Sequence, residues 1–306
     1  MQKTNKITMP KFIKILKSQI SNIEVKSDKS FKDLTTFKIG GKIKYFIEIK
    51  EVNILLKILN LANKYSIRYF ILGQGSNLLA SDKVCKILIL KISLNSIVVR
   101  KNKIICGSGV SLFKLNHFAI KNNLTGLEWS YGIPGSVGGA VKMNAGSFGG
   151  EIKNVVDCVY YTDGYKIYKK QKSSLEFDYR KSFFTNNNFV ILKVIFCLEK
   201  SESSIIEKLC FDNYEKRRKM QPYNMPSAGS VFKRPLNAFA PVLIQRSKLK
   251  GVACGGAKIS SKHCGFIVNE SGQATFKQVF KLIAKIKKTV LKKFDIILEE
   301  EIIILR

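Results

Sequence analysis

Acidic residues, histidine and long hydrophobic runs are scarce in this chain of 306 residues. It has 22 Asp and Glu against 53 Lys and Arg, for a formal net charge of +31. Its two histidines leave a serine hydrolase without a convincing base. No run reaches the roughly 18 uninterrupted apolar residues of a membrane span, and lysines interrupt the segment where a signal peptide would need its apolar core. We therefore expect a cytoplasmic protein without membrane insertion.

The seven cysteines follow neither a disulfide nor a zinc pattern. Their number is odd and no pair has C-x-x-C spacing, which argues against a zinc ribbon and a thioredoxin-like motif. Most lie in apolar runs typical of strands, such as the run that ends at Cys197, where a buried, inert thiol is expected. This pattern favours a reducing compartment and predicts no metal site.

The positive charge has more than one explanation. A basic surface is typical of proteins that bind nucleic acids or anionic membranes. The lysines are spread over the whole chain among many isoleucines and asparagines, however, without a basic tail or an arginine–glycine repeat. Lys, Asn and Ile have A/T-rich codons, so a biased genome would produce the same composition, and an anionic small substrate would also suit it. We expect no specific nucleic-acid partner.

Apolar periodicity predicts a mixed architecture. Hydrophobic residues at 45% and charged residues at 25% are ordinary for a globular protein, and the length allows about two domains. Helical spacing appears within the first thirty residues and over 51–65, 111–122 and 275–294, whereas strands are expected at 69–72, 87–90, 97–100, 104–106, 189–198 and 296–305. Without regular βαβ alternation, this order predicts an α+β fold, with a domain boundary near residue 200.

Two glycine-rich segments are candidate anion sites. Gly73-x-Gly75-Ser76-Asn77 follows a predicted strand, and its backbone N–H groups could point at a phosphate. It matches neither G-x-G-x-x-G nor a Walker loop, so an ordinary strand-to-loop connection is the alternative. The second segment runs from Gly132 to Gly150. Its glycines lose much backbone entropy on folding, a cost that is explained if the main chain passes directly against a flat or charged ligand. The alternative is a buried glycine-rich turn without a ligand.

Four polar residues could carry chemistry. Ser230 lies on a turn close to Lys233 without a G-x-S-x-G elbow, so it could be a nucleophile, a proton donor or a cap. Arg180 lies among aromatic residues and could bind a carboxylate in bidentate fashion. Glu299 and Glu301 would share one face of the predicted last strand, where partial burial would raise their pKa and suit them to act as acids. A solvated edge strand paired with lysines is the alternative.

Six segments follow one another along the chain: Thr35-Thr36-Phe37-Lys38-Ile39-Gly40-Gly41, the Gly73 turn, Gly132 to Gly146, Tyr179-Arg180-x-Ser182-x-Phe184, Pro226-Ser227-Ala228-Gly229-Ser230-x-Phe232-Lys233 and Leu298-Glu299-x-Glu301. In this order they resemble the UDP-N-acetylenolpyruvoylglucosamine reductase family. Each segment is weak alone, but six in family order are highly specific. They cover the chain from about residue 30 to its end.

The resemblance implies a fold, a reaction and a division of the chain. The fold is an FAD-binding region of the vanillyl-alcohol-oxidase type over 31–200, followed by an α+β substrate-binding domain over 201–306, with residues 1–30 as a helical extension. The reaction uses non-covalent FAD and NADPH to reduce UDP-N-acetylglucosamine enolpyruvate, a UDP-sugar, to UDP-N-acetylmuramate for peptidoglycan. The short run between Arg180 and Ser230 resembles the type that lacks an inserted tyrosine loop, and we expect a monomer.

The resemblance also implies residue roles. Arg180 and Glu301 would stabilise the developing negative charge, Ser230 would donate the proton, and Arg218 and Lys233 would bind substrate. The implied FAD contacts are Gly73, Gly75, Ser76, Asn77, Leu78, Gly132, Ile133, Pro134, Gly135, Ser136, Val137, Gly138, Gly139, Asn144, Ala145 and Gly146. Two departures stand out: Arg234 replaces the usual asparagine, and the segment after Asp82 lacks expected glycines.

Three rival hypotheses remain at this point. The nearest is another FAD-dependent oxidoreductase of the same fold, although a plain alcohol oxidase needs no proton donor such as Ser230. A basic nucleic-acid-binding protein would show tight, salt-sensitive binding to DNA or RNA and no bound flavin. A serine hydrolase at Ser230 would need a base that the sequence does not supply.

Overall fold

The computed structural model describes residues 7–306, and the chain divides into two compact units. The first unit comprises the described part of Met1–Ser27 together with Lys44–Gly73 and Lys86–Tyr214, and the second comprises Asp28–Ile43, Gln74–Cys85 and Glu215–Arg306. Two short N-terminal segments thus belong with the C-terminal part of the chain. The functional division at residues 30 and 200 stays a prediction.

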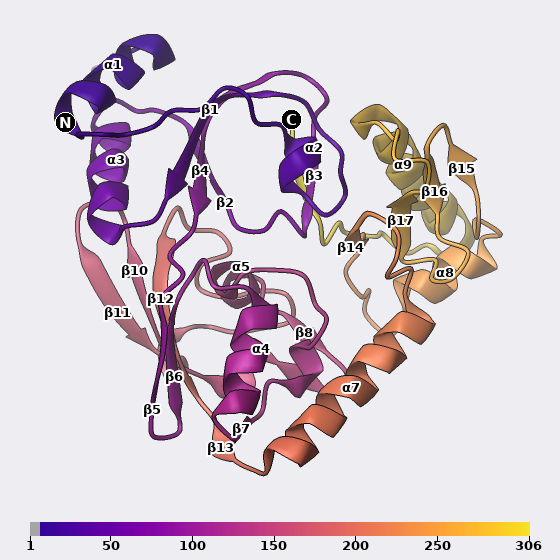
Figure 1. Ribbon diagram of the computed structural model, residues 1–306. Coiled ribbons are helices and arrows are strands. Elements are labelled where there is room, and N and C mark those ends of the chain that lie inside the picture. Colours follow the sequence, from indigo (N-terminus) through magenta and orange to yellow (C-terminus); the bar gives the residue numbers. More distant parts are fainter. Residues whose placement is uncertain (1–6) are drawn as a thin grey trace. The chain divides into compact units, whose positions relative to one another are not determined.

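The first unit begins with a small sheet covered by two helices. Its strand order is β1 (Ile43–Ile49), β4 (Cys85–Ile92), β2 (Tyr69–Leu72), and β2 runs parallel to β4. Helices α1 (Met9–Gln19) and α3 (Val52–Lys64) pack beside each other (Figure 1), because Phe12 and Leu16 of α1 share a buried cluster with Leu55 of α3. This confirms the predicted helices in both places. The predicted N-terminal extension also includes residues 1–6, which lie outside the described residues.

The first unit also contains a five-stranded antiparallel sheet. Its order is β11 (Ile167–Gln171), β10 (Val156–Thr162), β12 (Val190–Cys197), β6 (Lys103–Gly107), β5 (Ile97–Arg100). The β10–β11 hairpin turns at Asp163, whose carboxylate accepts hydrogen bonds from two following N–H groups, as an Asx turn does. Helices α4 (Leu112–Lys121) and α5 (Val137–Lys142) contribute to the buried cluster that this sheet shares.

Short elements complete the first unit around this core. Two two-stranded ladders pair β13 (Glu199–Lys200) with β7 (Leu124–Thr125), and β8 (Gly146–Ser147) with β9 (Gly150–Glu151). The unit also contains two 3-10 turns, η1 (Glu128–Ser130) and η2 (Lys172–Ser174), and the one-turn helix α6 (Ile152–Val155). The long helix α7 (Ser203–Met220) starts in this unit and ends in the second, just before Pro222.

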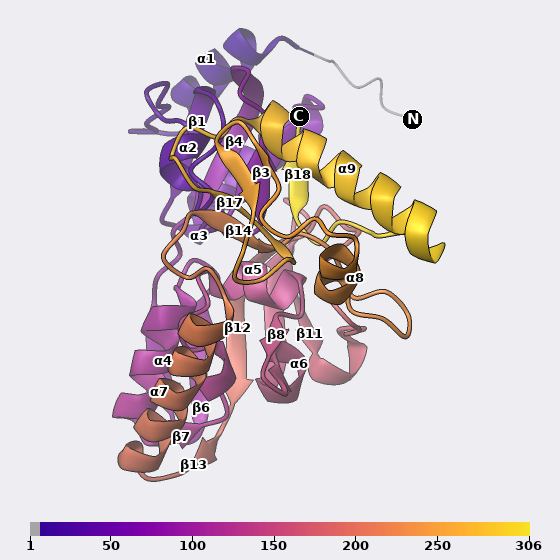
Figure 2. The ribbon, with the colours of Figure 1, turned by 90° about the vertical axis from the view of Figure 1, so that its right-hand side faces the viewer.

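The second unit is a four-stranded sheet packed on helices. The strand order is β14 (Ser227–Ser230), β17 (Phe266–Asn269), β16 (Ala257–Ile259), β15 (Ala253–Cys254). Helices α9 (Phe276–Phe294) and α8 (Ala240–Arg246) share its buried core (Figure 2). The helix predicted over 275–294 is confirmed, and it starts with a reciprocal capping box between Thr275 and Gln278, which satisfies two backbone donors at once.

The predicted strand over 296–305 is too long. The structure has only β18 (Ile303–Leu305) there, parallel to β3 (Leu78–Ala80), and a single bridge joins Glu300 to Phe232. The short helix α2 (Phe31–Leu34) belongs to the same unit. The strand is short because the chain changes its pairing partner: residues 299–301 are hydrogen-bonded to residues 231–233, and pairing with β3 begins only at Ile303. An apolar pattern alone does not show where an extended segment changes partner.

The mixture of helices with largely antiparallel sheets confirms the α+β class. Over the described residues, none of the helices has both the length and the apolar character needed to cross a bilayer. Within the described residues none of the seven cysteines forms a disulfide, and burial raises the pKa of Cys106 and, to about 12, that of Cys210. Thiols with raised pKa values are poor nucleophiles at neutral pH.

Candidate functional site

The glycine-rich segment of the first unit is bound to the loop that precedes α4. The N–H of Val137 donates to the carbonyl of Val110 at 2.8 Å, and the N–H of Gly138 donates to the carbonyl of Ser108 at 2.8 Å. Ser136 caps α5, since its hydroxyl accepts from the N–H of Gly139. Backbone hydrogen bonds and a helix cap therefore hold this segment in place.

Two neighbouring glycines in α5 show whether this segment is rich in glycine because of internal packing or because a ligand binds there. A Cβ at position 138 would lie 2.9 Å from the Ser108 Cβ, so the fold itself requires glycine there. A Cβ at position 139 would meet, among described residues outside its own helix and chain neighbours, just the Ser136 hydroxyl at 3.4 Å. Internal packing therefore explains Gly138 but not Gly139. A ligand that approaches the backbone would explain Gly139.

An unsatisfied polar atom lies beside this segment. The Ser108 hydroxyl is buried and has no hydrogen-bond partner within the described part of the chain. Buried hydroxyls are normally hydrogen-bonded, so a polar ligand at this position would satisfy it. Together with the open position at Gly139, this fits a bound FAD.

The structure brings Gly73 to the second glycine-rich segment, within the first unit. A Cβ at Gly73 would lie 2.5 Å from the Ser136 Oγ, so a side chain there would collide with the cap of α5. The Lys91 ammonium donates to the Gly73 carbonyl, and burial lowers the pKa of Lys91. Lys91 was not predicted from sequence, because one lysine in a strand does not stand out among 53 basic residues.

The rest of the Gly73 turn belongs to the second unit, where it is connected to Glu301. Gly75 has a φ of +64°, and a Cβ there would lie 2.5 Å from the Leu34 carbonyl oxygen. The Asn77 amide donates to the Glu301 carbonyl at 3.1 Å, and the N–H of Ile303 donates to the Asn77 carbonyl at 2.9 Å. The segment Gly75, Ser76, Asn77 and Leu78 thus holds the backbone on both sides of Ile302.

Arg180 is docked on the end of the first unit's glycine-rich segment. It lies in a turn closed by two backbone hydrogen bonds between Asp178 and Lys181, of 3.0 and 3.1 Å. Its φ of +53° is in the left-handed region, which is costly for a residue with a Cβ. Its guanidinium donates to the Gly146 carbonyl at 2.9 Å and lies over the Tyr179 ring. Strain of this kind often marks a functional position.

Ser230 and Glu301 are connected by the backbone within the second unit. Ser230 ends β14, and the carbonyl of the next residue, Val231, accepts from the N–H of Glu301 at 2.8 Å. The N–H of Lys233 donates to the Glu299 carbonyl at 2.9 Å. The structure therefore holds the predicted proton donor and the predicted acid on one short backbone ladder. Both residues are half-buried.

The other two glutamates of the triplet pair with lysines. Glu299 lies 3.2 Å from the Lys233 ammonium, and Glu300 lies 2.9 Å from that of Lys287. This matches the lysine-paired alternative for Glu299. The expectation that Glu299 and Glu301 share a strand face is not met, because the chain has only the bridge at Glu300 before β18 begins.

A basic pocket of about 580 Å³ lies within the second unit and includes Arg218. Its lining residues are Glu215, Arg218, Lys219, Pro222, Tyr223, Asn224, Met225, Lys258, Ser260, Ser261, Lys262, Val268 and Glu270. Lys233 does not line it, so the two predicted substrate residues are not in one pocket. Arg217, next in sequence to Arg218, is buried, and burial lowers its pKa to about 10.

Several of these basic residues escaped sequence analysis. Lys219, Lys258 and Lys262 gather in the pocket from α7 and from the segment around β16, and the Lys262 ammonium donates to the Arg218 carbonyl. His263 follows them, and burial lowers its pKa, so the neutral imidazole is favoured. No spacing rule marks these residues, because they converge through tertiary structure.

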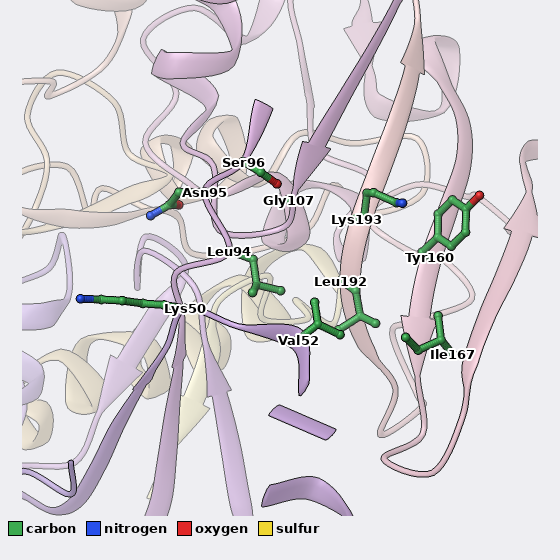
Figure 3. A pocket seen from close by; sticks show the side chains of 10 residues that line it. All are labelled: Lys50, Val52, Leu94, Asn95, Ser96, Gly107, Tyr160, Ile167, Leu192 and Lys193. Carbon is green, nitrogen blue, oxygen red and sulfur yellow. The ribbon is translucent and has the colours of Figure 1, made fainter. Parts of the chain in front are cut away.

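A second, smaller pocket of about 280 Å³ lies in the first unit and contains none of the predicted residues. The Lys193 ammonium lies 4.2 Å from the centroid of the Tyr160 ring. Figure 3 shows Lys50 pointing away from Lys193, on the other side of Leu94, so the two cations do not converge. Within the described residues, no cluster of three or more His, Cys, Asp or Glu could hold a metal.

Comparisons with known proteins agree with this geometry. Residues 43–163 match a family model described as an FAD binding domain, and residues 221–305 match one described as the C-terminal domain of UDP-N-acetylenolpyruvoylglucosamine reductase. The UDP-N-acetylenolpyruvoylglucosamine reductase of Clostridium novyi is 40% identical over 291 residues, 94% of each chain. That of Clostridium kluyveri is 42% identical over 288 residues, 93% of this chain and 94% of the relative.

A solved structure is similar over the same extent. The UDP-N-acetylenolpyruvylglucosamine reductase of Thermus caldophilus superposes with a TM-score of 0.80 at 30% identity, and the match covers 93% of this chain and all of the other. Sequence identity at this coverage confirms what the six ordered motifs indicated. The chain belongs to the UDP-N-acetylenolpyruvoylglucosamine reductase family.

Proposed function

We propose that this chain is an FAD-containing UDP-N-acetylmuramate dehydrogenase. It reduces UDP-N-acetylglucosamine enolpyruvate with NADPH in peptidoglycan precursor synthesis, and thereby serves cell wall biogenesis. The observation that carries the proposal is identity of about 40% over nearly the full length of relatives named for this activity. The orphaned Ser108 hydroxyl and the open position at Gly139 support a flavin in the first unit.

The cofactor determines what the protein must provide. FAD, when bound, accepts hydride from NADPH and delivers it to the vinyl carbon of the enolpyruvyl ether. Gly73, Ser136, Gly139 and the other glycine-rich positions would line it with their backbone. A glycine-lined backbone can approach a flavin diphosphate closely, and its N–H dipoles favour the negative charge.

The chain's own residues then perform the acid and charge chemistry. Arg180, a permanent cation, and Glu301, a hydrogen-bonding acid, would stabilise charge that develops toward the substrate carboxylate. Ser230 would donate the proton to the carbon adjacent to the reduced one. The backbone bond from Glu301 to Val231 limits how far the acid and the hydroxyl can move apart. Arg218 and Lys233 would neutralise the anionic groups of the UDP-sugar.

The proposal extends to the state of the protein in the cell. The enzyme acts in the cytoplasm as a monomer, and its excess of lysine causes at most weak, nonspecific binding to DNA. Saturable, sequence-selective DNA binding at physiological salt would contradict this part of the proposal, since nonspecific phosphate contacts weaken steeply with salt.

The test uses the visible absorption of the purified protein under anaerobic conditions. NADPH is expected to bleach the oxidised-flavin band, and the enolpyruvyl sugar is then expected to restore it in proportion to the sugar consumed. A protein that stays colourless after reconstitution with FAD would contradict the assignment. A flavin that NADPH bleaches but the sugar does not reoxidise would favour another FAD-dependent oxidoreductase of the same fold.

The substitution Gly139→Ala tests the flavin contact directly. Alanine is favoured over glycine in helices by about 1 kcal/mol, and the site has room for its methyl group, so the FAD-free protein should melt no lower than wild type. The same methyl group would press on the flavin, and overpacking costs about 1–3 kcal/mol. FAD binding, measured by quenching of flavin fluorescence, should weaken roughly tenfold to hundredfold.

The neighbouring substitution Gly138→Ala is the matched control. Its Cβ would lie 2.9 Å from the Ser108 Cβ and 3.2 Å from the Ser108 carbonyl oxygen, so it should lower the melting temperature of the FAD-free protein. If Gly139→Ala instead destabilises the protein and leaves FAD affinity unchanged, the glycines serve packing alone.

A further inference from the structure

We propose that Asn144 is a positioning residue for Arg180, and that it acts by holding the turn from Asp178 to Lys181. The inference rests on the proposed function, because it concerns the placement of the arginine to which that function assigns a role. The resemblance groups Asn144 with the FAD contacts, but it says nothing of a connection to Arg180.

The side chain of Asn144 is fully buried and uses both of its polar atoms within the first unit. Its Nδ2 donates to the Asp178 carbonyl at 3.0 Å and to the Glu151 Oε2 at 2.7 Å, and its Oδ1 accepts from the N–H of Lys153 at 3.0 Å. The partners fix the orientation of the amide, since a carbonyl and a carboxylate accept whereas an N–H donates.

These bonds reach the turn at the point that controls Arg180. The Asp178 carbonyl accepts from the Lys181 N–H, which closes the turn, and also from Asn144. Arg180 lies inside that turn with a φ of +53°, a conformation that its own preferences disfavour. An external hydrogen bond at the closing carbonyl opposes relaxation of the turn toward ordinary backbone angles.

The same segment also holds the far end of the Arg180 side chain. The guanidinium Nη2 donates to the Gly146 carbonyl at 2.9 Å, two residues beyond Asn144. Asn144 therefore secures the backbone of Arg180, and Gly146 secures its charged group. With both ends held by one segment, the guanidinium direction depends on that segment's shape.

Further hydrogen bonds hold the segment that contains Asn144 and Gly146. Gly146 pairs with Glu151 across the β8–β9 ladder, and the N–H of Ile152 donates to the Ala145 carbonyl at 2.9 Å. The Glu151 carboxylate that accepts from Asn144 also pairs with the Lys153 ammonium at 2.7 Å. Asn144 has a φ of +41°, which asparagine tolerates better than most residues. Asparagine thus satisfies both the backbone angle and the hydrogen bonds, whereas glycine would satisfy the angle alone.

The test compares Asn144→Gly with a buried asparagine that has no connection to the turn. Asn116 is also buried in the first unit, and its amide donates to the Leu112 carbonyl and the Ser130 hydroxyl. Stopped-flow absorption of the FAD-loaded proteins separates flavin reduction by NADPH from flavin reoxidation by the enolpyruvyl sugar. Asn144→Gly should slow reoxidation about 10²-fold, the cost of a misplaced catalytic group, and leave reduction unchanged. Asn116→Ala should change neither rate.

Two further readouts distinguish positioning from general stability. Hydrogen exchange over residues 178–181 should quicken in Asn144→Gly and not in Asn116→Ala, since the turn loses an external bond. In an Arg180→Ala background, Asn144→Gly should slow reoxidation no further, because residues that act as a unit are not additive. Asn144→Asp, which keeps the shape but places an oxygen against the Asp178 carbonyl, should reproduce the effect if Asn144→Gly fails to fold.

Each possible negative result would contradict a different claim. A wild-type flavin that the sugar does not reoxidise would overturn the proposed function and this inference with it. An Arg180→Ala protein with wild-type reoxidation would overturn the role of Arg180. If both of those hold, unchanged reoxidation in the Asn144 variants, additive effects in the double variant, or unchanged exchange in the turn would overturn the positioning role alone.

Discussion

Replacing Ser230 by alanine is expected to lower turnover of the enolpyruvyl sugar by about 10²–10⁴-fold, the range for loss of a positioned proton donor. The backbone should not change, because the bonds around this position come from its neighbour: Val231 donates its N–H to Gly265 and accepts from Glu301. Flavin reduction by NADPH should continue at the wild-type rate, since that step needs no proton from Ser230.

The measurement is steady-state turnover together with anaerobic bleaching of the flavin. Ser227→Ala, at the other end of β14, is the control, because the carbonyl of Ser227 accepts from the Thr36 hydroxyl and is kept in the variant. Its turnover should equal that of wild type. Full turnover in Ser230→Ala would remove the proton-donor role and favour a different oxidoreductase chemistry.

Replacing Arg180 by glycine is expected to separate activity from stability. The guanidinium is the cation assigned to the developing negative charge, and removal of such a group costs about 10²–10³-fold in turnover. The φ of +53° at this position costs a residue with a Cβ roughly 1–2 kcal/mol, and glycine avoids that cost. The loss of the hydrogen bond to Gly146 offsets part of the gain. The melting temperature should therefore stay the same or rise, although turnover falls by the factor given above.

Lys101→Gly is the matched control for the backbone effect. Lys101 has a φ of +56° in the β5–β6 hairpin of the same unit and is exposed, so glycine should relieve similar strain there and leave turnover unchanged. Thermal unfolding and steady-state kinetics on the FAD-loaded proteins measure both quantities. A marked fall in the melting temperature of Arg180→Gly would show instead that the arginine serves the fold more than the reaction.

Much of the local structure could be predicted because it depends on consecutive residues. The stripe over 275–294 identifies α9, and Asp163 and Gly164 identify the β10–β11 hairpin. The end of α7 before Pro222 follows from the missing N–H of proline. The family could be recognised from the order of its motifs, because glycines and polar residues at special positions tolerate few replacements. None of these inferences needs to know which distant residue is a neighbour.

Tertiary structure alone decided the rest, because it depends on partners that lie far apart in the sequence. The grouping of residues 28–43 and 74–85 with the C-terminal unit has no local marker. β18 is short because the chain changes its pairing partner from residues 231–233 to β3. The fold requires glycine at 138 and not at 139 because Ser108 lies against position 138. The sequence by itself determined the helices α1, α3, α4 and α9, the turn at Asp163 and the family. Only the tertiary structure decided how Asn144, Arg180 and Glu301 are held. Each of them is fixed by a hydrogen bond to a residue far from it in the chain.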